Sequence, residues 1–199
     1  MTAKPRVSSS KLADRLLAAA EVADLAGAGL QAATWPEPNP HYEPVGSLWN
    51  ARNLLLQAAN EVDPVSLGVH RSAITKPVLA YGFVQTGGYV VGTMLAVLLS
   101  PASTIWYILP AVLVGWAAAY PLIPYLHRRL AWARLRAADR APSGSVAALE
   151  SLVEGFDDLL ADIQPEISPG RRAAYDSAAA ADHDLRWAVQ NMPPVPATR

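Results

Sequence analysis

The feature that most constrains this chain is an uncharged run of fifty residues, 77–126, which contains no Asp, Glu, Lys, Arg or His. Its first part, residues 77–99, would form a helix of roughly 34 Å at about 1.5 Å per residue. This length is sufficient to cross the hydrocarbon core of a bilayer, which is about 30 Å thick. Residues 105–126 form a second apolar run, and only residues 100–104 lie between the two. The pattern predicts two transmembrane helices that form a hairpin.

A soluble alternative is that both runs are buried helices of a globular bundle. A helix in such a bundle normally keeps a polar stripe on its outer face. Neither run carries an ionisable side chain on any face, and uncharged apolar runs of this length are the most dependable sign of a membrane helix that a sequence offers. The membrane interpretation is therefore favoured.

Basic residues flank the hairpin on both outer sides. His70, Arg71 and Lys76 precede it, several arginines follow it from Arg128 onward, and the turn at residues 100–104 contains no Lys or Arg. Because cytoplasmic loops carry an excess of Lys and Arg, this distribution predicts that both termini are cytoplasmic. We expect a multi-pass protein of the inner (plasma) membrane. Its many alanines and its preference for Arg over Lys are typical of a bacterial source.

The sequence predicts an all-α protein in three parts. These are an N-terminal cytoplasmic segment at residues 1–76 with a proline-rich linker at 35–44, the hairpin at 77–126, and a C-terminal cytoplasmic segment at 127–199. Amphipathic helices are expected in both cytoplasmic segments. Each segment is close to the size at which a lone hydrophobic core becomes marginal. We therefore expect the two segments to pack into one bundle or against a partner.

Apolar periodicity places the helices of the cytoplasmic segments. The first is expected from Ser10 to Leu25, with Gly27 and Gly29 weakening its end. Its narrow, alanine-rich stripe suits close packing against a neighbouring helix, and binding to a membrane surface is the second interpretation. Further helices are expected at residues 45–63, 127–140, 146–163 and 171–192.

Two polar residues have expected positions in these helices. Ser145 is expected to be the N-cap of the helix at 146–163, because a serine side chain accepts hydrogen bonds from the first turn. Arg52 is expected on the polar face of the helix at 45–63, together with Trp49 and Asn53.

Small residues recur at four-residue intervals in both predicted spans. Gly88 and Gly92 match the G-x-x-x-G spacing that lets two membrane helices approach closely. The full set expected to pack the spans together or to join copies of the chain is Gly82, Gly87, Gly88, Gly92, Ala111, Gly115 and Ala119. Gln85 and Thr86 are the polar pair at depth. We expect them to hydrogen-bond between helices, and lining a pore is the bolder interpretation.

Charged residues are concentrated after the hairpin. Arg128, Arg129, Arg134 and Arg136 are expected to meet anionic lipid headgroups, at about 1 kcal/mol for each basic residue near the surface. Residues 144–166 contain six acids and no base. This acidic stretch is either a solvated polar face or a docking surface for the basic stretch or a basic partner.

We find no motif for catalysis or cofactor binding in the sequence. It lacks cysteine, a phosphate-binding glycine loop and a nucleophile elbow. Asp182, His183 and Asp184 are the one dense group of possible metal ligands, but adjacent residues on a helix point in different directions and do not converge on one ion. The net charge of −1 does not suit nucleic-acid binding. We expect no enzymatic activity, no cofactor and no metal.

The leading functional hypothesis is a non-catalytic anchor or scaffold in the membrane that self-associates or docks a cytoplasmic partner. One alternative is an oligomeric pore of the holin or effector type, in which several hairpins surround Gln85 and Thr86. A third is an accessory subunit of a larger membrane complex. The expected partners are the lipid bilayer and either further copies of the chain or a cytoplasmic protein.

Overall fold

The computed structural model describes residues 7–33, 42–64, 90, 94, 122–164 and 166–195. Over these residues it contains six α-helices and no strand, which confirms the predicted all-α class. The chain divides into two compact units. The first combines Met1–Arg71 with Trp132–Arg199, and the second is Ser72–Ala131. Most of the predicted hairpin lies outside the described residues, so its two spans remain a prediction.

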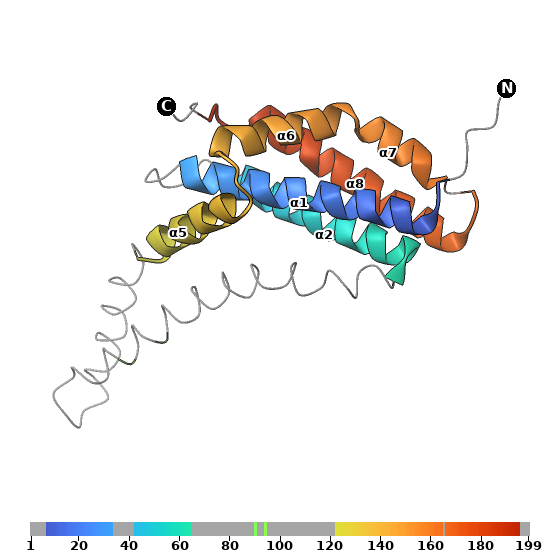
Figure 1. Cartoon of the computed structure of the whole chain (residues 1–199), viewed down its shortest axis with the longest axis horizontal. Helices are drawn as coiled ribbons and strands as arrows, with labels where there is room; N and C mark the ends of the chain where they lie inside the picture. The colour runs from blue at the N-terminus through green and yellow to red at the C-terminus, as the bar shows by residue number, and fades with distance from the viewer. Residues whose placement is uncertain are drawn as a thin grey trace. The chain divides into compact units, whose positions relative to one another are not determined.

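Three long helices form the centre of the first unit. They are α1 (Ser9–Ala33), α2 (Tyr42–Val62) and α8 (Pro169–Asn191), and Figure 1 shows α2 running antiparallel to the other two. Helix α2 packs extensively against both α1 and α8. The helices α2 and α8 come from opposite sides of the predicted hairpin, so the expected packing of the two segments into one bundle is confirmed.

The buried residues of these helices follow the alternating three- and four-residue intervals of a coiled-coil seam. Alanine is frequent in all three seams, and small side chains at a contact allow helix axes to approach closely. The seams are Leu12, Leu16, Ala19, Ala23, Ala26 and Leu30 in α1, Leu48, Ala51, Leu55 and Ala58 in α2, and Ala174, Ala178, Ala181, Leu185 and Ala188 in α8.

Two shorter helices complete the bundle. Helix α6 (Pro142–Glu154) packs mainly on α1, and α7 (Phe156–Ile163) packs mainly on α8. The apolar residues predicted for one helix at 146–163 do enter the core, among them Leu149, Phe156 and Ile163. The single predicted helix is nevertheless divided at Gly155. This division is consistent with the low helix propensity of glycine.

The structure corrects the predicted end of the first helix and the predicted start of the second. Helix α1 does not weaken at Gly27 and Gly29 but continues to Ala33. Both glycines are close-packing positions, because a Cβ on Gly29 would lie 3.0 Å from the carbonyl oxygen of Pro142 and one on Gly27 would lie 3.3 Å from Trp49 Nε1. Helix α2 begins inside the predicted linker, at Tyr42; a proline in the first turn of a helix loses no hydrogen bond. Residues 34–41 of that linker lie outside the described residues.

The prediction that Ser145 is an N-cap is wrong. Helix α6 begins four residues earlier than predicted, at Pro142, with Ala141 as its N-cap and a proline in the first turn, which fits helical geometry well. Ser145 is therefore inside the helix and buried. Its hydroxyl donates a hydrogen bond to the carbonyl oxygen of Pro142 at 2.7 Å.

Helix α8 begins at Pro169, two residues before the predicted range of 171–192, with the proline in its first turn. Ser168 is the N-cap and its Oγ accepts a hydrogen bond from the backbone N–H of Arg171 at 3.2 Å. The guanidinium of Arg171 is buried and donates to three carbonyl oxygens, those of Val7 at 2.9 Å, Ile163 at 3.1 Å and Asp162 at 3.4 Å. One arginine thus joins the start of α8, the end of α7 and the segment before α1.

One described helix, α1, is long and apolar enough to cross a membrane by length and composition. More than half of its apolar stretch is buried inside the bundle, where α1 packs against α2 and α6. The prediction that this helix packs against neighbouring helices is confirmed.

Candidate functional site

The basic stretch after the predicted hairpin forms helix α5 (Leu122–Ala137), as the sequence predicts, although the helix ends at Ala137 and not at residue 140. Its arginines differ in their surroundings. Arg129 and Arg136 are exposed and Arg128 is half-buried. Arg134 points inward, and its Nη2 pairs with Oδ2 of Asp24 on α1. The predicted contact with lipid headgroups therefore remains a proposal for the outward arginines, since the guanidinium of Arg134 has a partner within the first unit.

Asp24 is the centre of a cluster that joins three helices. Besides Arg134, it faces Arg52 of α2, whose Nε lies 3.4 Å from Asp24 Oδ1. The side chains of Asp24, Arg52 and Arg134 are 15%, 7% and 16% exposed. Burial lowers the pKa of both arginines below the usual value for a guanidinium. The cluster fixes the end of α5 that belongs to the first unit against α1 and α2.

The buried position of Arg52 contradicts the prediction that it lies on a polar face. Arg52 is adjacent to Ala51 in the α2 seam, and Asp24 is adjacent to Ala23 in the α1 seam. Charged residues that flank a coiled-coil seam commonly form ion pairs between helices. The sequence contained this signal, but it did not indicate which acid would meet which arginine.

Several predicted site residues lie outside the described residues. They are the packing residues Gly82, Gly87, Gly88, Gly92, Ala111, Gly115 and Ala119 and the polar pair Gln85 and Thr86. Two other residues of the first predicted span, Val90 and Met94, are described. Both are helical and exposed.

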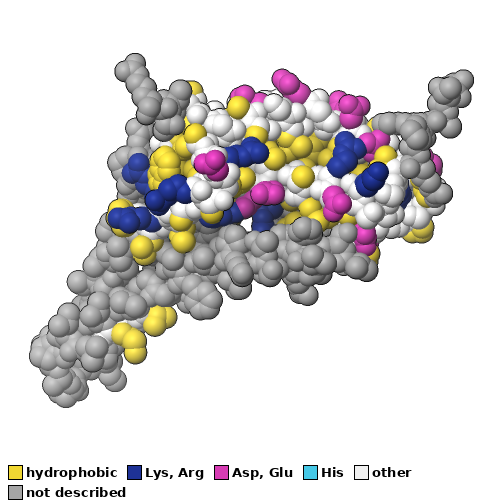
Figure 2. All heavy atoms as spheres, in the orientation of Figure 1, with side chains coloured by type: hydrophobic (Ala, Val, Ile, Leu, Met, Phe, Trp, Pro, Cys, Tyr) yellow, Lys and Arg dark blue, Asp and Glu magenta, His cyan; other side chains and the backbone are white. Residues whose placement is uncertain are grey.

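Two acids of the stretch at residues 144–166 pair with arginines outside the basic stretch. Asp162 pairs with Arg15 of α1, and Asp157 lies 3.0 Å from Arg186 of α8. Figure 2 shows one side of the molecule, on which the Arg and Lys side chains of the described residues are interspersed with Asp and Glu side chains. The interpretation of a docking surface for the basic stretch is therefore unsupported by the described ion pairs.

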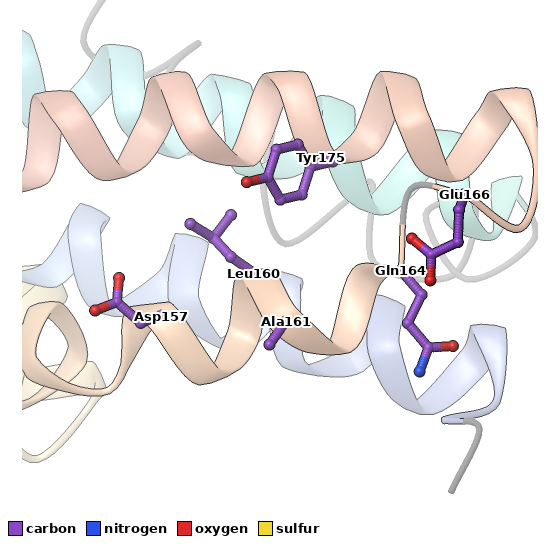
Figure 3. A pocket seen from close by; sticks show the side chains of 6 residues that line it. All are labelled: Asp157, Leu160, Ala161, Gln164, Glu166 and Tyr175. Atoms are coloured by element: carbon purple, nitrogen blue, oxygen red, sulfur yellow. The ribbon is translucent and has the colours of Figure 1, made fainter. Parts of the chain in front are cut away.

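A shallow pocket of about 430 Å³ lies between α7 and α8. In Figure 3, Leu160 of α7 and Tyr175 of α8 point toward one another, and Asp157 and Glu166 lie toward opposite ends. Ala161 and Gln164 complete the lining. The polar groups of this lining are two carboxylates, one amide and one tyrosine hydroxyl.

The group of Asp182, His183 and Asp184 is divided among different partners. Arg186 donates to both carboxylate oxygens of Asp182 at 2.8 and 2.9 Å, and this hydrogen bonding raises the pKa of Arg186. Asp184 accepts a hydrogen bond from Asn50 of α2, while His183 is 80% exposed. Within the described ranges, no three His, Cys, Asp or Glu residues gather in a way that could hold a metal ion.

Comparison with protein-family models, with curated proteins and with solved structures finds no match to this chain. The functional argument therefore rests on the sequence and on the geometry of the bundle and α5.

Proposed function

We propose that this chain is an integral membrane protein that acts as a non-catalytic anchor or scaffold. In this proposal a two-span hairpin at residues 77–126 holds a helical bundle at one membrane surface. The bundle self-associates or docks a cytoplasmic protein. The observation that carries the proposal is the origin of the bundle, whose helices come from both sides of the uncharged run.

The origin of the bundle restricts the number of spans. Helix α2 precedes the uncharged run and α8 follows it, yet the two pack extensively along their length. Both flanks must therefore lie on the same side of any membrane that the run crosses. An even number of crossings meets this condition and a single crossing does not. Two spans of 23 and 22 residues match the length that a bilayer requires.

The two described residues of the first span support its contact with lipid. Val90 and Met94 are one helical turn apart and both are exposed, so they occupy one side of a helix. Gly88 and Gly92 precede them by two residues each, which places the glycines about 200° away on a helical wheel. One face would meet lipid tails while the glycine face packs against the second span or another copy.

The arginines after the run and the absence of Lys and Arg at residues 100–104 favour a cytoplasmic bundle. The proposal therefore places both termini in the cytoplasm and the turn outside.

The mass of the complex, purified in its native lipid, tests the scaffold. Gly88→Leu and Gly92→Leu should change the number of copies, because a leucine prevents close helix approach. Val90→Leu is the matched control on the other helix face and should leave the mass unchanged. Ion permeability should not respond to any of these variants.

Two results would contradict the scaffold. Depolarisation of cells on overexpression, relieved by Gln85→Leu, would indicate a pore. Copurification of a fixed ratio of an unrelated membrane polypeptide, with no effect of either glycine variant on assembly, would indicate an accessory subunit.

A further inference from the structure

The contacts of α5 divide it into two faces with different roles. Leu135 is fully buried and Arg134 pairs with Asp24, so this side belongs to the bundle. Tyr125, Arg129 and Arg136 are all exposed. They are separated by four and seven residues, spacings that bring side chains onto one side of a helix. We name these three residues the outer face of α5.

The chemistry of the outer face suits a phosphate group. Helix α5 contains four arginines and no Asp or Glu. Arg129 Nε donates to the hydroxyl of Tyr125 at 3.0 Å, and the guanidinium carbon lies 5.4 Å from the centre of the tyrosine ring. That hydrogen bond uses one of the five N–H groups of the guanidinium. The tyrosine holds the arginine in place, and a planar guanidinium binds phosphate oxygens in a bidentate manner.

We propose that the outer face of α5 binds the headgroups of anionic phospholipids in the adjacent leaflet. The inference rests on the proposed membrane function and assigns a partner to one face of one helix. Charge complementarity supports it, because two exposed guanidiniums meet no carboxylate on their own helix. The position of α5 also supports it, since the helix includes the last residues of the second predicted span, and Tyr125 lies near the end of that span, where aromatic rings favour the membrane interface.

The test uses a fluorescent label on the outer side of α5 in the full-length protein. The chain has no cysteine, so Ala133→Cys, at an exposed position of α5, takes a single environment-sensitive fluorophore. The labelled protein is placed in nanodiscs of phosphatidylcholine with increasing fractions of phosphatidylglycerol. We expect the emission to shift to shorter wavelength as phosphatidylglycerol increases. High salt should reverse the shift, because ions screen exposed charges.

Charge removal then locates the contact. Arg129→Gln and Arg136→Gln should each weaken the apparent affinity for phosphatidylglycerol about fivefold, which corresponds to about 1 kcal/mol per basic residue near an anionic surface. The matched control is the double variant Lys11→Gln/Arg172→Gln, which removes two exposed charges outside α5. This control should keep the lipid response of the unsubstituted protein.

Three results would overturn the headgroup assignment. The first is an emission that is the same with and without phosphatidylglycerol. The second is a control variant that weakens the response as much as the outer-face variants do. The third is a shift that soluble glycerol phosphate reproduces in nanodiscs of phosphatidylcholine alone. Each of these leaves the membrane anchor intact. Recovery of the protein from the soluble fraction would instead contradict the proposed function, so the two failures are distinguishable.

Discussion

Asp24 faces the guanidiniums of Arg52 and Arg134 on two other helices, and all three side chains are largely withdrawn from solvent. A charge in such a place is favourable only while its counter-charge remains. The carboxylate is shared by both arginines, so its loss affects both ion pairs at once. The loss of Arg134 would leave Asp24 with Arg52.

We predict that Asp24→Asn lowers the free energy of unfolding by about 3 kcal/mol, the lower end of the range for breaking a buried ion pair. Arg134→Gln should lower it by less. The control is Asp14→Asn on the same helix, an exposed position where changes are usually within about 0.5 kcal/mol. Unfolding followed by circular dichroism in a membrane mimic measures all three. Equal losses for Asp24→Asn and Asp14→Asn would show that solvent screens the cluster.

Gly29 supplies a second prediction for a single residue. A Cβ at this position would lie 3.0 Å from the carbonyl oxygen of Pro142 and would also crowd the hydroxyl of Ser145. Overpacking of this kind typically destabilises a protein by about 1–3 kcal/mol. Gly29→Ala should therefore lower the melting temperature, although alanine is the better helix former.

Gly46→Ala is the matched control for the glycine. Gly46 is also helical, and a Cβ there meets nothing within 4 Å. Alanine should raise stability at Gly46 by up to about 1 kcal/mol through helix propensity alone. If both variants raised the melting temperature, the close approach of α1 and α6 at Gly29 would be contradicted.

At the scale of helices, Arg171 holds the ends of two elements and the segment before a third. Its guanidinium donates to the carbonyl oxygens of Val7, Asp162 and Ile163. Removing a buried donor leaves those acceptors unsatisfied, at about 1–3 kcal/mol for each affected group. Two carbonyls of the last turn of α7, where a helix leaves its C=O groups to partners outside it, accept hydrogen bonds from this arginine.

We predict that Arg171→Met exposes the backbone amides near Val7 and the last turn of α7 to faster hydrogen exchange, with little change in the middle of α2. Arg171→Lys should recover only part of the protection, because lysine lacks the planar fork of five donors. Arg172→Met changes the exposed neighbour and should leave exchange unaltered. Uniform loss of protection over the whole bundle would contradict a local tie.

The elements differ in how well the sequence predicts them. Apolar periodicity predicts most of the described helices but not the division of residues 146–163 into α6 and α7. Pro169 is a local signal for the start of α8, because proline favours the first turn of a helix. The positions of Ser145, Gly29 and Arg52 did not follow. Gly29 and Arg52 are determined by contacts with segments distant in the sequence, about which local propensity holds no information. Ser145 lies inside α6 because Pro142, a local signal, opens that helix.

At the scale of the whole molecule, the important property is that one bundle is built from both ends of the chain. The size of each flanking segment predicted packing against the other segment or against a partner, because a lone core of that size is marginal. Which helices would pair could not be predicted. The alanine-rich seams of α1, α2 and α8 are too alike to specify a partner, and the selective contacts come from Asp24, Arg52 and Arg171.

The most direct measurement of the central claim is the sidedness of three single cysteines, introduced as Ser8→Cys, Gln190→Cys and Ser103→Cys. Ser8 and Gln190 are exposed on the described bundle, and Ser103 lies in the predicted turn. A membrane-impermeant maleimide is applied to spheroplasts and to inverted vesicles. The account predicts that positions 8 and 190 are labelled only in inverted vesicles and position 103 only in spheroplasts. Labelling of positions 8 and 190 from opposite sides, or of all three from the same side, would contradict it.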